Sequence, residues 1–296
     1  MEIVDAQIHV WEDDPPPSRS WEADRLTSTN MPVAVTVEAA VAAMDAVGVD
    51  AAVLSVPPTY RKLIADTFHR YDNSYGEEAA TNYPQRFCSV MRIDPRDPEL
   101  EEQLALGMRG PGVVGLRIAV TAPDQMELLR SGGYERLFTA AEEQAAPIML
   151  LVQPDLDTVP EIARAHPDLA LILDHVGLVQ PNMHRPPEPD PLGRLAEVTK
   201  LGSFANVYVK LTGIVTLSSE AYPFADLREP MHRLIDAFGA QRLLWGSDYT
   251  RTRKAGRTYA ESVELLKYAI DVSEQDRTQM FGASTRSVLR WPAMAT

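Results

Sequence analysis

The chain has 296 residues, of which 45% are hydrophobic and 24% are charged, proportions close to those of an ordinary globular protein. This apolar content is enough for a large core and excludes an intrinsically disordered chain. Asp and Glu (42) outnumber Lys and Arg (28), so the formal net charge is −14, which argues against nucleic acid and anionic membrane as partners. A small anionic ligand stays compatible with this charge, because a pocket can be locally basic.

Three absences narrow the class of protein further. The single cysteine, Cys88, excludes an intrachain disulfide and Cys-x-x-Cys metal sites. The first residues lack the basic and apolar segments of a secretory signal, and no apolar run reaches the roughly 18 residues of a transmembrane helix. We therefore expect a soluble, cytoplasmic protein with a single domain over residues 1–296, since barrels commonly use about 250 residues for one domain. A homo-oligomer remains open.

Eight short apolar runs have the length of strands. In chain order they are Glu2–His9, Ala51–Val56, Phe87–Ile93, Val113–Val120, Pro147–Gln153, Ala170–Val176, Val207–Gly213 and Arg242–Asp248. Each is followed by a stretch with helical period. These stretches span Val37–Val47, Tyr75–Ala80, Leu100–Met108, Leu137–Gln144, Val159–Ala163, Leu192–Val198, Met231–Phe238 and Val263–Ile270.

The strand runs are nearly continuous in Val, Ile and Leu, as in a parallel sheet that is covered on both faces. Eight strand–helix units in this length predict a single (β/α)8 TIM barrel of the α/β class. A doubly wound open sheet is the alternative. It would usually carry a glycine-rich turn after the first strand, but that strand continues as His-Val-Trp at 9–11.

Long polar or proline-rich segments follow several strands, whereas the segments that enter strands, such as Gly48–Asp50, are short. The long segments are Glu12–Pro32, Pro57–Arg70, Gly177–Pro191, Ile214–Phe224 and Tyr249–Thr258. Active sites of TIM barrels lie at the carboxyl ends of the strands, among the loops that follow them. We therefore expect the functional site on the face that carries these long segments.

Polar side chains gather at the predicted strand ends. Residues two apart share one face of a strand, so Asp5, Gln7 and His9 should all point into the barrel. The set expected at the barrel mouth is Gln7, His9, Arg117, His175, Lys210 and Asp248. Each has a structural alternative: a histidine can be a satisfied core residue, Asp248 can cap a helix and Lys210 can extend to solvent. Their coincidence at the ends of different strands favours catalysis, because buried charges are rare without partners.

Four motifs stand in order along these strands. They read Val-Asp-Ala-Gln-Ile-His-Val-Trp at 4–11, Asp-His-Val-Gly at 174–177, Val-Lys-Leu-Thr-Gly at 209–213 and Leu-Trp-Gly-Ser-Asp-Tyr at 244–249. Together with Tyr-Asp-Asn at 71–73 and Gly-Leu-Arg at 115–117, they resemble the amidohydrolase superfamily. The branch resembled is amidohydrolase-2, which includes 2-pyrone-4,6-dicarboxylate lactonase and sugar lactonases. The resemblance covers nearly the whole chain and implies a lactonase-like hydrolase.

The departures from this pattern concern metal ligands. Metal-dependent members carry His-x-His at the end of the first strand and often a histidine on the fifth, where this chain has Gln7 and Gln153. Amide oxygen is a weak ligand for zinc. The branch includes members that work without metal, so we expect no cofactor. The alternative is one divalent metal such as zinc at His9, His175 and Asp248, because three protein ligands suffice in a catalytic site.

The expected mechanism is hydrolysis of a lactone or related cyclic ester by activated water. Asp248 is the expected general base, and partial desolvation should raise its pKa toward the working range. His9 and His175 are expected to polarise the carbonyl in place of a metal, and Gln7 can donate to the same oxygen or to substrate. The three catalytic residues are therefore Asp248, His9 and His175.

Five side chains are expected to bind substrate: Gln7, Arg117, Lys210, Gln153 and Arg251. The guanidinium of Arg117 suits a carboxylate, and Lys210 could stabilise charge or hold substrate. Arg251 lies in a basic segment that also contains Arg253, Lys254 and Arg257. This segment is either a solvated loop face or a local anion site. The second interpretation favours a small, carboxylate-bearing substrate.

Two rival functions remain. Related barrels decarboxylate aromatic or semialdehyde acids with a metal, a reaction that would need the metal that the two glutamines argue against. A barrel that binds ligand without catalysis is the third possibility, and the joint presence of His9, His175 and Asp248 argues against it.

Overall fold

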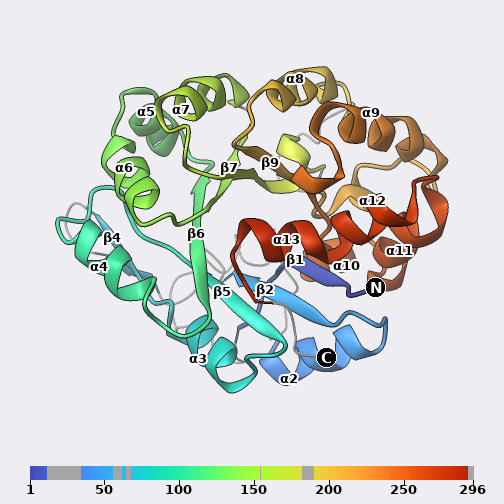
Figure 1. Ribbon diagram of the computed structural model, residues 1–296, viewed down its shortest axis with the longest axis horizontal. Helices are drawn as coiled ribbons and strands as arrows, with labels where there is room; N and C mark the ends of the chain where they lie inside the picture. Colours follow the sequence, from blue (N-terminus) through green and yellow to red (C-terminus); the bar gives the residue numbers. More distant parts are fainter. Residues whose placement is uncertain (12–34, 56–61, 65–67, 154, 182–189, 293–296) are drawn as a thin grey trace.

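The computed structural model describes residues 1–11, 35–55, 62–64, 68–153, 155–181 and 190–292. Eight parallel strands pair in chain order and form a nearly closed barrel with helices around it (Figure 1). They are β1 (Val4–Ile8), β2 (Ala51–Ser55), β5 (Phe87–Met91), β6 (Val113–Val120), β7 (Ile148–Val152), β8 (Leu171–Leu173), β9 (Val207–Lys210) and β10 (Leu243–Leu244). The Ala6 amide donates to the Trp245 carbonyl at 2.9 Å and so joins the first strand to the last. The predicted TIM barrel is confirmed.

All eight predicted helical stretches overlap a helix. These helices are α2 (Val37–Asp45), α3 (Ser74–Asn82), α4 (Leu100–Gly107), α6 (Glu135–Glu143), α7 (Val159–Ala165), α8 (Leu195–Lys200), α9 (Arg228–Phe238) and α11 (Tyr259–Glu264). The last stretch, Val263–Ile270, contains only the end of α11 and continues as a π-helix over Leu265–Ala269. The described ranges also contain four short helices and a hairpin that the sequence pattern did not predict. These are α5 (Pro123–Arg130), α10 (Tyr249–Lys254), α12 (Glu274–Thr278), α13 (Ser284–Val288) and the antiparallel pair β3 (Lys62–Ile64) and β4 (His69–Tyr71).

Local capping explains where several helices begin. The Thr36 hydroxyl accepts from the Ala39 amide at the start of α2, and Thr258 forms a capping box with Glu261 at the start of α11. The missed helix α5 has Pro123 at its first turn, which is a usual start signal. Because α5 has only eight residues and a mostly polar sequence, its helical period did not stand out.

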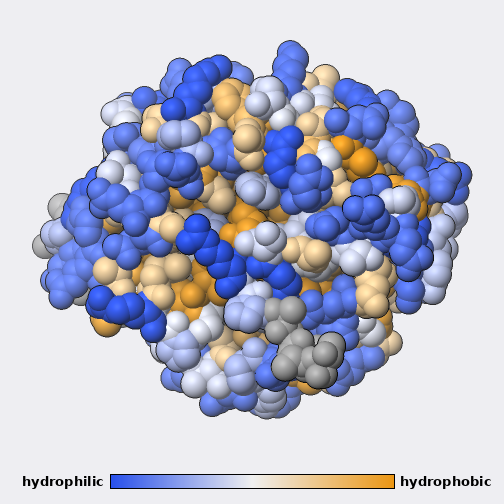
Figure 2. Space-filling view, viewed as in Figure 1, coloured by the Kyte–Doolittle hydropathy of each residue, from blue (hydrophilic) through white to orange (hydrophobic). Residues whose placement is uncertain are grey.

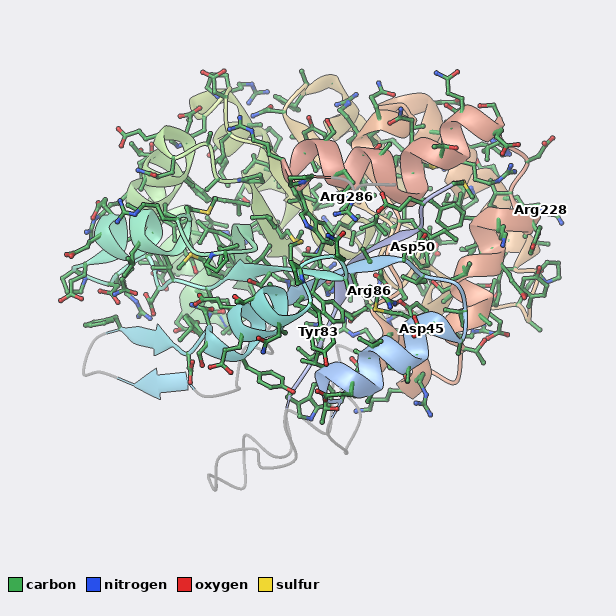
Figure 3. The ribbon with its side chains drawn as sticks, turned by 60° about the horizontal axis from the view of Figure 1, so that its bottom comes forward. Asp45, Asp50, Tyr83, Arg86, Arg228 and Arg286 are labelled. Atoms are coloured by element: carbon green, nitrogen blue, oxygen red, sulfur yellow. The ribbon has the colours of Figure 1, made fainter. Side chains whose placement is uncertain are left out.

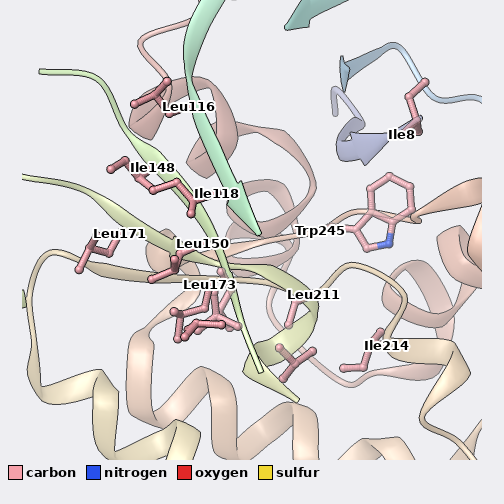
Figure 4. Close-up of a cluster of buried hydrophobic side chains, with 14 of the residues drawn as sticks. Ile8, Leu116, Ile118, Ile148, Leu150, Leu171, Leu173, Leu211, Ile214 and Trp245 are labelled. Atoms are coloured by element: carbon pink, nitrogen blue, oxygen red, sulfur yellow. The ribbon is translucent and has the colours of Figure 1, made fainter. Parts of the chain in front are cut away.

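Alternation along the strands separates two apolar layers. The side chains that face outward pack against the helices, as Figure 4 shows for Leu116, Ile148 and Leu171. Those that face inward fill the barrel below the site, and Leu289 and Trp291 join them from the chain after α13. The inward set from the strands is Val4, Ala6, Ala51, Val53, Cys88, Val90, Val114, Met149, Ile172 and Leu244. In Figure 1, α13 crosses the centre of the barrel on this side.

Ion pairs and hydrogen bonds hold the end at which the chain enters the strands. Arg86 donates to Asp45 at 2.8 Å and to the Val49 carbonyl, which ties the end of α2 to the start of β5 (Figure 3). On α13, Arg286 donates to Glu2 at 2.6 Å. Figure 2 shows hydrophilic residues over most of the face viewed. Within the described ranges, no helix is long and apolar enough to cross a membrane.

The sixth and eighth predicted strands, Ala170–Val176 and Arg242–Asp248, are shorter than expected, because the backbone turns at their carboxyl ends. His175, Val176 and Asp248 have positive φ angles of 52°, 61° and 47°. Of the expected long segments, residues 12–32, 57–61, 65–67 and 182–189 lie outside the described residues. The described part of 57–70 contributes β3 and most of β4, and the segment after β10 begins with α10.

Candidate functional site

The eight side chains predicted for the site are all buried and all lie at the carboxyl end of the barrel. Their exposed fractions do not exceed 7%. They are Gln7 and His9 on or after β1, Arg117 on β6, Gln153 after β7, His175 after β8, Lys210 on β9, and Asp248 and Arg251 at α10. Contacts divide most of them into two groups, one around Asp248 and one around Lys210.

Asp248 is the centre of the first group. Its Oδ1 lies 3.4 Å from His9 Nε2, and its Oδ2 lies 3.7 Å from His175 Nδ1 and 3.5 Å from Arg251 Nε. The residue occupies the N-cap position of α10, yet its side chain makes no capping hydrogen bond. Oδ1 has no hydrogen-bond partner among the described residues. The helix-cap alternative therefore does not account for this carboxylate.

The expected rise in the pKa of Asp248 is wrong. Burial raises this pKa, but the positive charge of Arg251, with contributions from His175, His9 and Arg117, lowers it further than burial raises it. The net pKa lies below the usual range of an aspartate. Asp248 is therefore ionised at neutral pH and is always available as a proton acceptor.

Both histidines are neutral at neutral pH. Burial lowers the pKa of His9 to about 4 and that of His175 to about 3, although Asp248 opposes both shifts. The Ser55 carbonyl lies 2.6 Å from His9 Nδ1, so Nδ1 carries the proton and Nε2 the lone pair. Neutral His9 therefore cannot donate from Nε2 to a carbonyl, and the expected polarising role is wrong for this residue. For His175, the Thr212 hydroxyl lies 3.1 Å from Nδ1.

The second group is a buried ion network that the sequence analysis missed in part. Lys210 Nζ donates to Gln7 Oε1 at 2.5 Å and lies 2.6 Å from Asp174 Oδ1. Arg117 Nε donates to Asp174 Oδ2 at 2.7 Å. Burial raises the pKa of Asp174, but Arg117 and Lys210 outweigh it and hold that pKa far below the usual range. Burial lowers the pKa of Lys210 to about 8. The sequence signal that could have identified Asp174 is its position directly before His175, a predicted site residue.

Alternation predicted that Asp5 shares a face with Gln7 and His9. In the structure it does not. The pairing of β1 with β2 shifts register between Asp5 and Ile8, so the alternation is broken there. Asp5 accepts hydrogen bonds from the Ser247 amide (2.9 Å), the Ser247 hydroxyl (2.5 Å) and the Tyr259 hydroxyl (2.8 Å). It thus faces α11 rather than the barrel interior and holds the residue next to Asp248.

A small cavity of about 30 Å³ adjoins this network between the ends of β5 and β6. Arg92, Arg117 and Tyr71 line it. Arg92 lies within the predicted run Phe87–Ile93, one residue beyond the end of β5, and was not predicted as a site residue. Burial, reinforced by the charge of Arg117, lowers the pKa of Arg92 to about 9. Asp94 also lines the cavity and accepts two hydrogen bonds from Arg96, so its charge is compensated.

The basic segment after β10 contributes one side chain to the site. Arg251 is buried, and its Nη1 has no hydrogen-bond partner among the described residues. Arg253 and Lys254 are exposed, and Arg253 donates to the Tyr249 hydroxyl. Arg257 donates to the Ser218 carbonyl. The segment is therefore a mainly surface-facing helix with one arginine turned inward, rather than a cluster of four cations.

Three of the six described non-glycine residues with positive φ lie at the two turns that carry His175 and Asp248. His175 and Asp248 adopt left-handed conformations, and so does Val176, whose branched side chain disfavours it. Such conformations cost free energy and persist where surrounding contacts impose them, as they often do at active sites. Here they turn His175 and Asp248 toward each other from two different strands.

The donor set does not fit a divalent metal. Gln7 and Gln153 stand where the resemblance implies histidine ligands, and the Gln7 oxygen already accepts from Lys210. The Arg251 guanidinium, 3.5 Å from Asp248, places a fixed positive charge beside the carboxylate that would bind the ion. In the described part of the chain, no three His, Cys, Asp or Glu side chains form a group that could hold a metal.

Comparison with known proteins identifies the family. A family model described as amidohydrolase matches residues 4–291, which is almost the whole chain. The chain belongs to the amidohydrolase family. The resemblance inferred from the strand-end motifs is thereby confirmed, and this amidohydrolase is an enzyme of a family with lactonase-like members.

One curated relative of this amidohydrolase has a known activity. The L-fucono-1,5-lactonase of Burkholderia ambifaria is 37% identical over 112 residues. The match covers 36% of this chain and 35% of that protein. Since about a third of each chain is compared, this likeness does not transfer the activity by itself.

Three solved structures share the fold over nearly their whole length. An amidohydrolase from Burkholderia multivorans with bound zinc is 19% identical, with a TM-score of 0.77 and coverage of 99% of this chain and 100% of that one. A protein assigned as a 2-pyrone-4,6-dicarboxylic acid hydrolase from Pseudomonas putida is 23% identical (TM-score 0.74, 99% of each chain). The 5-carboxyvanillate decarboxylase of Sphingomonas paucimobilis is 15% identical (TM-score 0.62, 98% and 99%). At these identities the likeness shows the fold alone.

Proposed function

We propose that this amidohydrolase opens the ring of a carboxylate-bearing lactone with water that Asp248 activates. The observation that carries the proposal is the state of Asp248: buried, ionised, and with one oxygen free of hydrogen-bond partners among the described residues. A base needs this combination, because a carboxylate that is fully engaged by protein donors cannot take a proton from water.

The proposed reaction proceeds in two steps. Asp248 takes a proton from water while the water oxygen bonds to the lactone carbonyl carbon, and His9 Nε2, which carries a lone pair, helps to orient that water. The resulting oxyanion is stabilised by the unpartnered Nη1 of Arg251. His175 assists from Nε2 in the tautomer in which the Thr212 hydroxyl donates to Nδ1. In the other tautomer Nδ1–H points to the Thr212 carbonyl, 3.4 Å away, and Nε2 is an acceptor. The ring C–O bond then breaks, and the departing oxygen receives the proton from Asp248, which leaves a hydroxy acid.

The charge balance of the site supports an anionic substrate. Three buried cations, Arg117, Lys210 and Arg251, share the barrel mouth with the two carboxylates of Asp174 and Asp248. Burying an uncompensated charge is costly, so this excess favours an anion from the substrate. We place a substrate carboxylate near Arg92 and Arg117, which line the same cavity.

The proposal includes catalysis without a metal, which the donor chemistry of Gln7 and the position of Arg251 support. Activity on a lactone panel should survive exhaustive dialysis against chelator, with metal content measured on the same sample. This part of the proposal would be contradicted if removal of a stoichiometric metal abolished activity and its return restored activity. Such dependence, with turnover of aromatic acids rather than lactones, would favour the decarboxylase alternative.

The role of Asp248 is tested by Asp248→Asn, which keeps the size of the side chain and removes the base. Turnover number should fall by about 10²–10⁴, with little change in KM. Because the pKa of Asp248 lies below its usual range, the acid limb of wild-type activity should lie below about pH 4. The exposed Asp271 supplies the matched control, Asp271→Asn. A near wild-type turnover number in Asp248→Asn would refute the assignment.

A further inference from the structure

Two buried glutamines at the barrel mouth have polar atoms that the protein does not satisfy. Gln153 and Gln180 are each 1% exposed. Gln153 Oε1 and Gln180 Nε2 have no hydrogen-bond partner among the described residues. Buried side-chain amides are normally paired, because an unpaired polar group away from water destabilises the fold. A pair of such groups near a reaction centre points to a ligand that completes them.

Gln153 reaches the barrel interior from the end of β7. Met149 faces inward, where its sulfur lies 3.2 Å from Lys210 Nζ. Residues two apart share a face, so Gln153 continues this inward row at the carboxyl end of the strand. Its Nε2 donates to the Leu178 carbonyl, beyond the turn that carries His175. That bond fixes the amide and leaves the Oε1 acceptor open.

Gln180 lies beside the catalytic carboxylate. Its Oε1 contacts the Thr216 hydroxyl, which also lies 2.7 Å from the Gly213 carbonyl, and its Nε2 has no hydrogen-bond partner among the described residues. Gly213, with a φ of 67°, lies between Gln180 and Asp248 and has no side chain to separate them. A Cβ at this position would lie 3.3 Å from Gln180 Oε1 and 3.9 Å from Asp248 Cβ. The two side chains are therefore within about 7 Å of each other.

We propose that Gln153 and Gln180 form a hydroxyl-binding subsite, so that the lactone opened here carries hydroxyl groups as well as a carboxylate. This inference rests on the proposed function. The open acceptor of Gln153 needs a donor, which a hydroxyl group supplies and a carboxylate does not. The open Nε2 of Gln180 donates equally well to the oxygen of a hydroxyl. A planar pyrone dicarboxylate has no hydroxyl and would leave Gln153 Oε1 unpaired.

The test compares two lactones that share a five-membered ring and a carboxylate. Glucaro-1,4-lactone carries hydroxyl groups, and 5-oxotetrahydrofuran-2-carboxylate carries none. The wild-type enzyme should prefer the hydroxylated lactone in kcat/KM by tenfold or more, since a site built to bond a hydroxyl rejects an analogue that lacks it. The same assay with 2-pyrone-4,6-dicarboxylate should give the lower kcat/KM expected of a substrate without hydroxyls.

Substitution assigns the preference to the amides. Gln153→Met and Gln180→Met keep side-chain length and remove the hydrogen-bonding groups, and each should reduce the preference by about tenfold, the worth of one hydrogen bond. Gln144→Met is the matched control, because Gln144 is exposed at the end of α6 on the opposite face of the barrel. The preference is a ratio within one variant, so partial loss of folded protein does not alter it.

The outcomes separate this inference from the function on which it rests. If neither lactone nor the pyrone is hydrolysed, the proposed function fails. If lactones are hydrolysed with no preference for hydroxyls, or if both glutamine variants retain the wild-type preference, the hydroxyl-binding subsite is refuted and the lactonase proposal stands.

Discussion

Asp174 should be the side chain whose neutralisation destabilises this barrel most. It is 1% exposed and contacts two cations that are equally buried, Arg117 at 2.7 Å and Lys210 at 2.6 Å. Asp174→Asn keeps the shape but leaves both cations without a compensating charge, and its amide group directs N–H donors at one of them. The perturbation therefore changes charge with almost no change in volume.

The expected cost follows from the burial of the network. Removing one partner of a buried ion pair typically costs about 3–5 kcal/mol, because the remaining charge stays desolvated. In a protein of this size, about 1 kcal/mol corresponds to about 2–4 °C, so Tm should fall by about 10 °C. Lys210→Met should cost less, because it removes one of the two cations and keeps the Arg117–Asp174 pair. The double variant should be more stable than Asp174→Asn alone.

Thermal denaturation followed by circular dichroism measures these differences, with Asp236→Asn on the exposed side of α9 as the control. The pKa of Asp174 is lowered in the folded protein, so its stabilisation is present above the unfolded pKa of about 4 and is lost as pH falls below it. The Tm gap between wild type and Asp174→Asn should therefore narrow in acid. A gap of less than about 2 °C at neutral pH would refute the argument, because it would mean that the cations are compensated elsewhere.

Two further predictions concern the same face. The pKa of Lys210 is lowered to about 8, so the cation is lost as pH rises above this value. KM for an anionic lactone should then rise, while KM for an uncharged lactone stays constant. A pH-independent KM for the anionic lactone would contradict this prediction. Gly213→Ala should lower both Tm and kcat/KM for a hydroxylated lactone, because its Cβ would lie 3.3 Å from Gln180 Oε1 at a φ of 67°. Gly48→Ala has similar strain (φ 73°) with nothing within 4 Å, so it should lower Tm alone; equal kinetic effects in both variants would show that strain, rather than contact, is responsible.

The sequence alone was sufficient for the barrel and for the meeting of the candidate side chains at its carboxyl end. Both depend on patterns that are local along the chain: runs of Val, Ile and Leu with strand length, stripes of helical period, and polar residues at the points where the runs end. The inward direction of Gln7 and His9 was predicted correctly. The carboxyl end of the barrel, where all eight candidate side chains lie, was also predicted correctly. The boundaries of β8 and β10 were less accurate, because left-handed residues such as His175 and Asp248 carry no distinct sequence signal outside glycine.

The chemistry of the site was decided by contacts between distant parts of the chain. Asp174 acquired its role from Arg117 and Lys210 on two other strands. A register shift in β1 turned Asp5 away from its expected face. The direction of the Asp248 pKa shift is a balance between burial and neighbouring charge, and neither quantity exists until the strands close into a barrel. Sequence patterns predict where polar groups gather, whereas charge state and proton position depend on distances and desolvation that the tertiary structure alone sets.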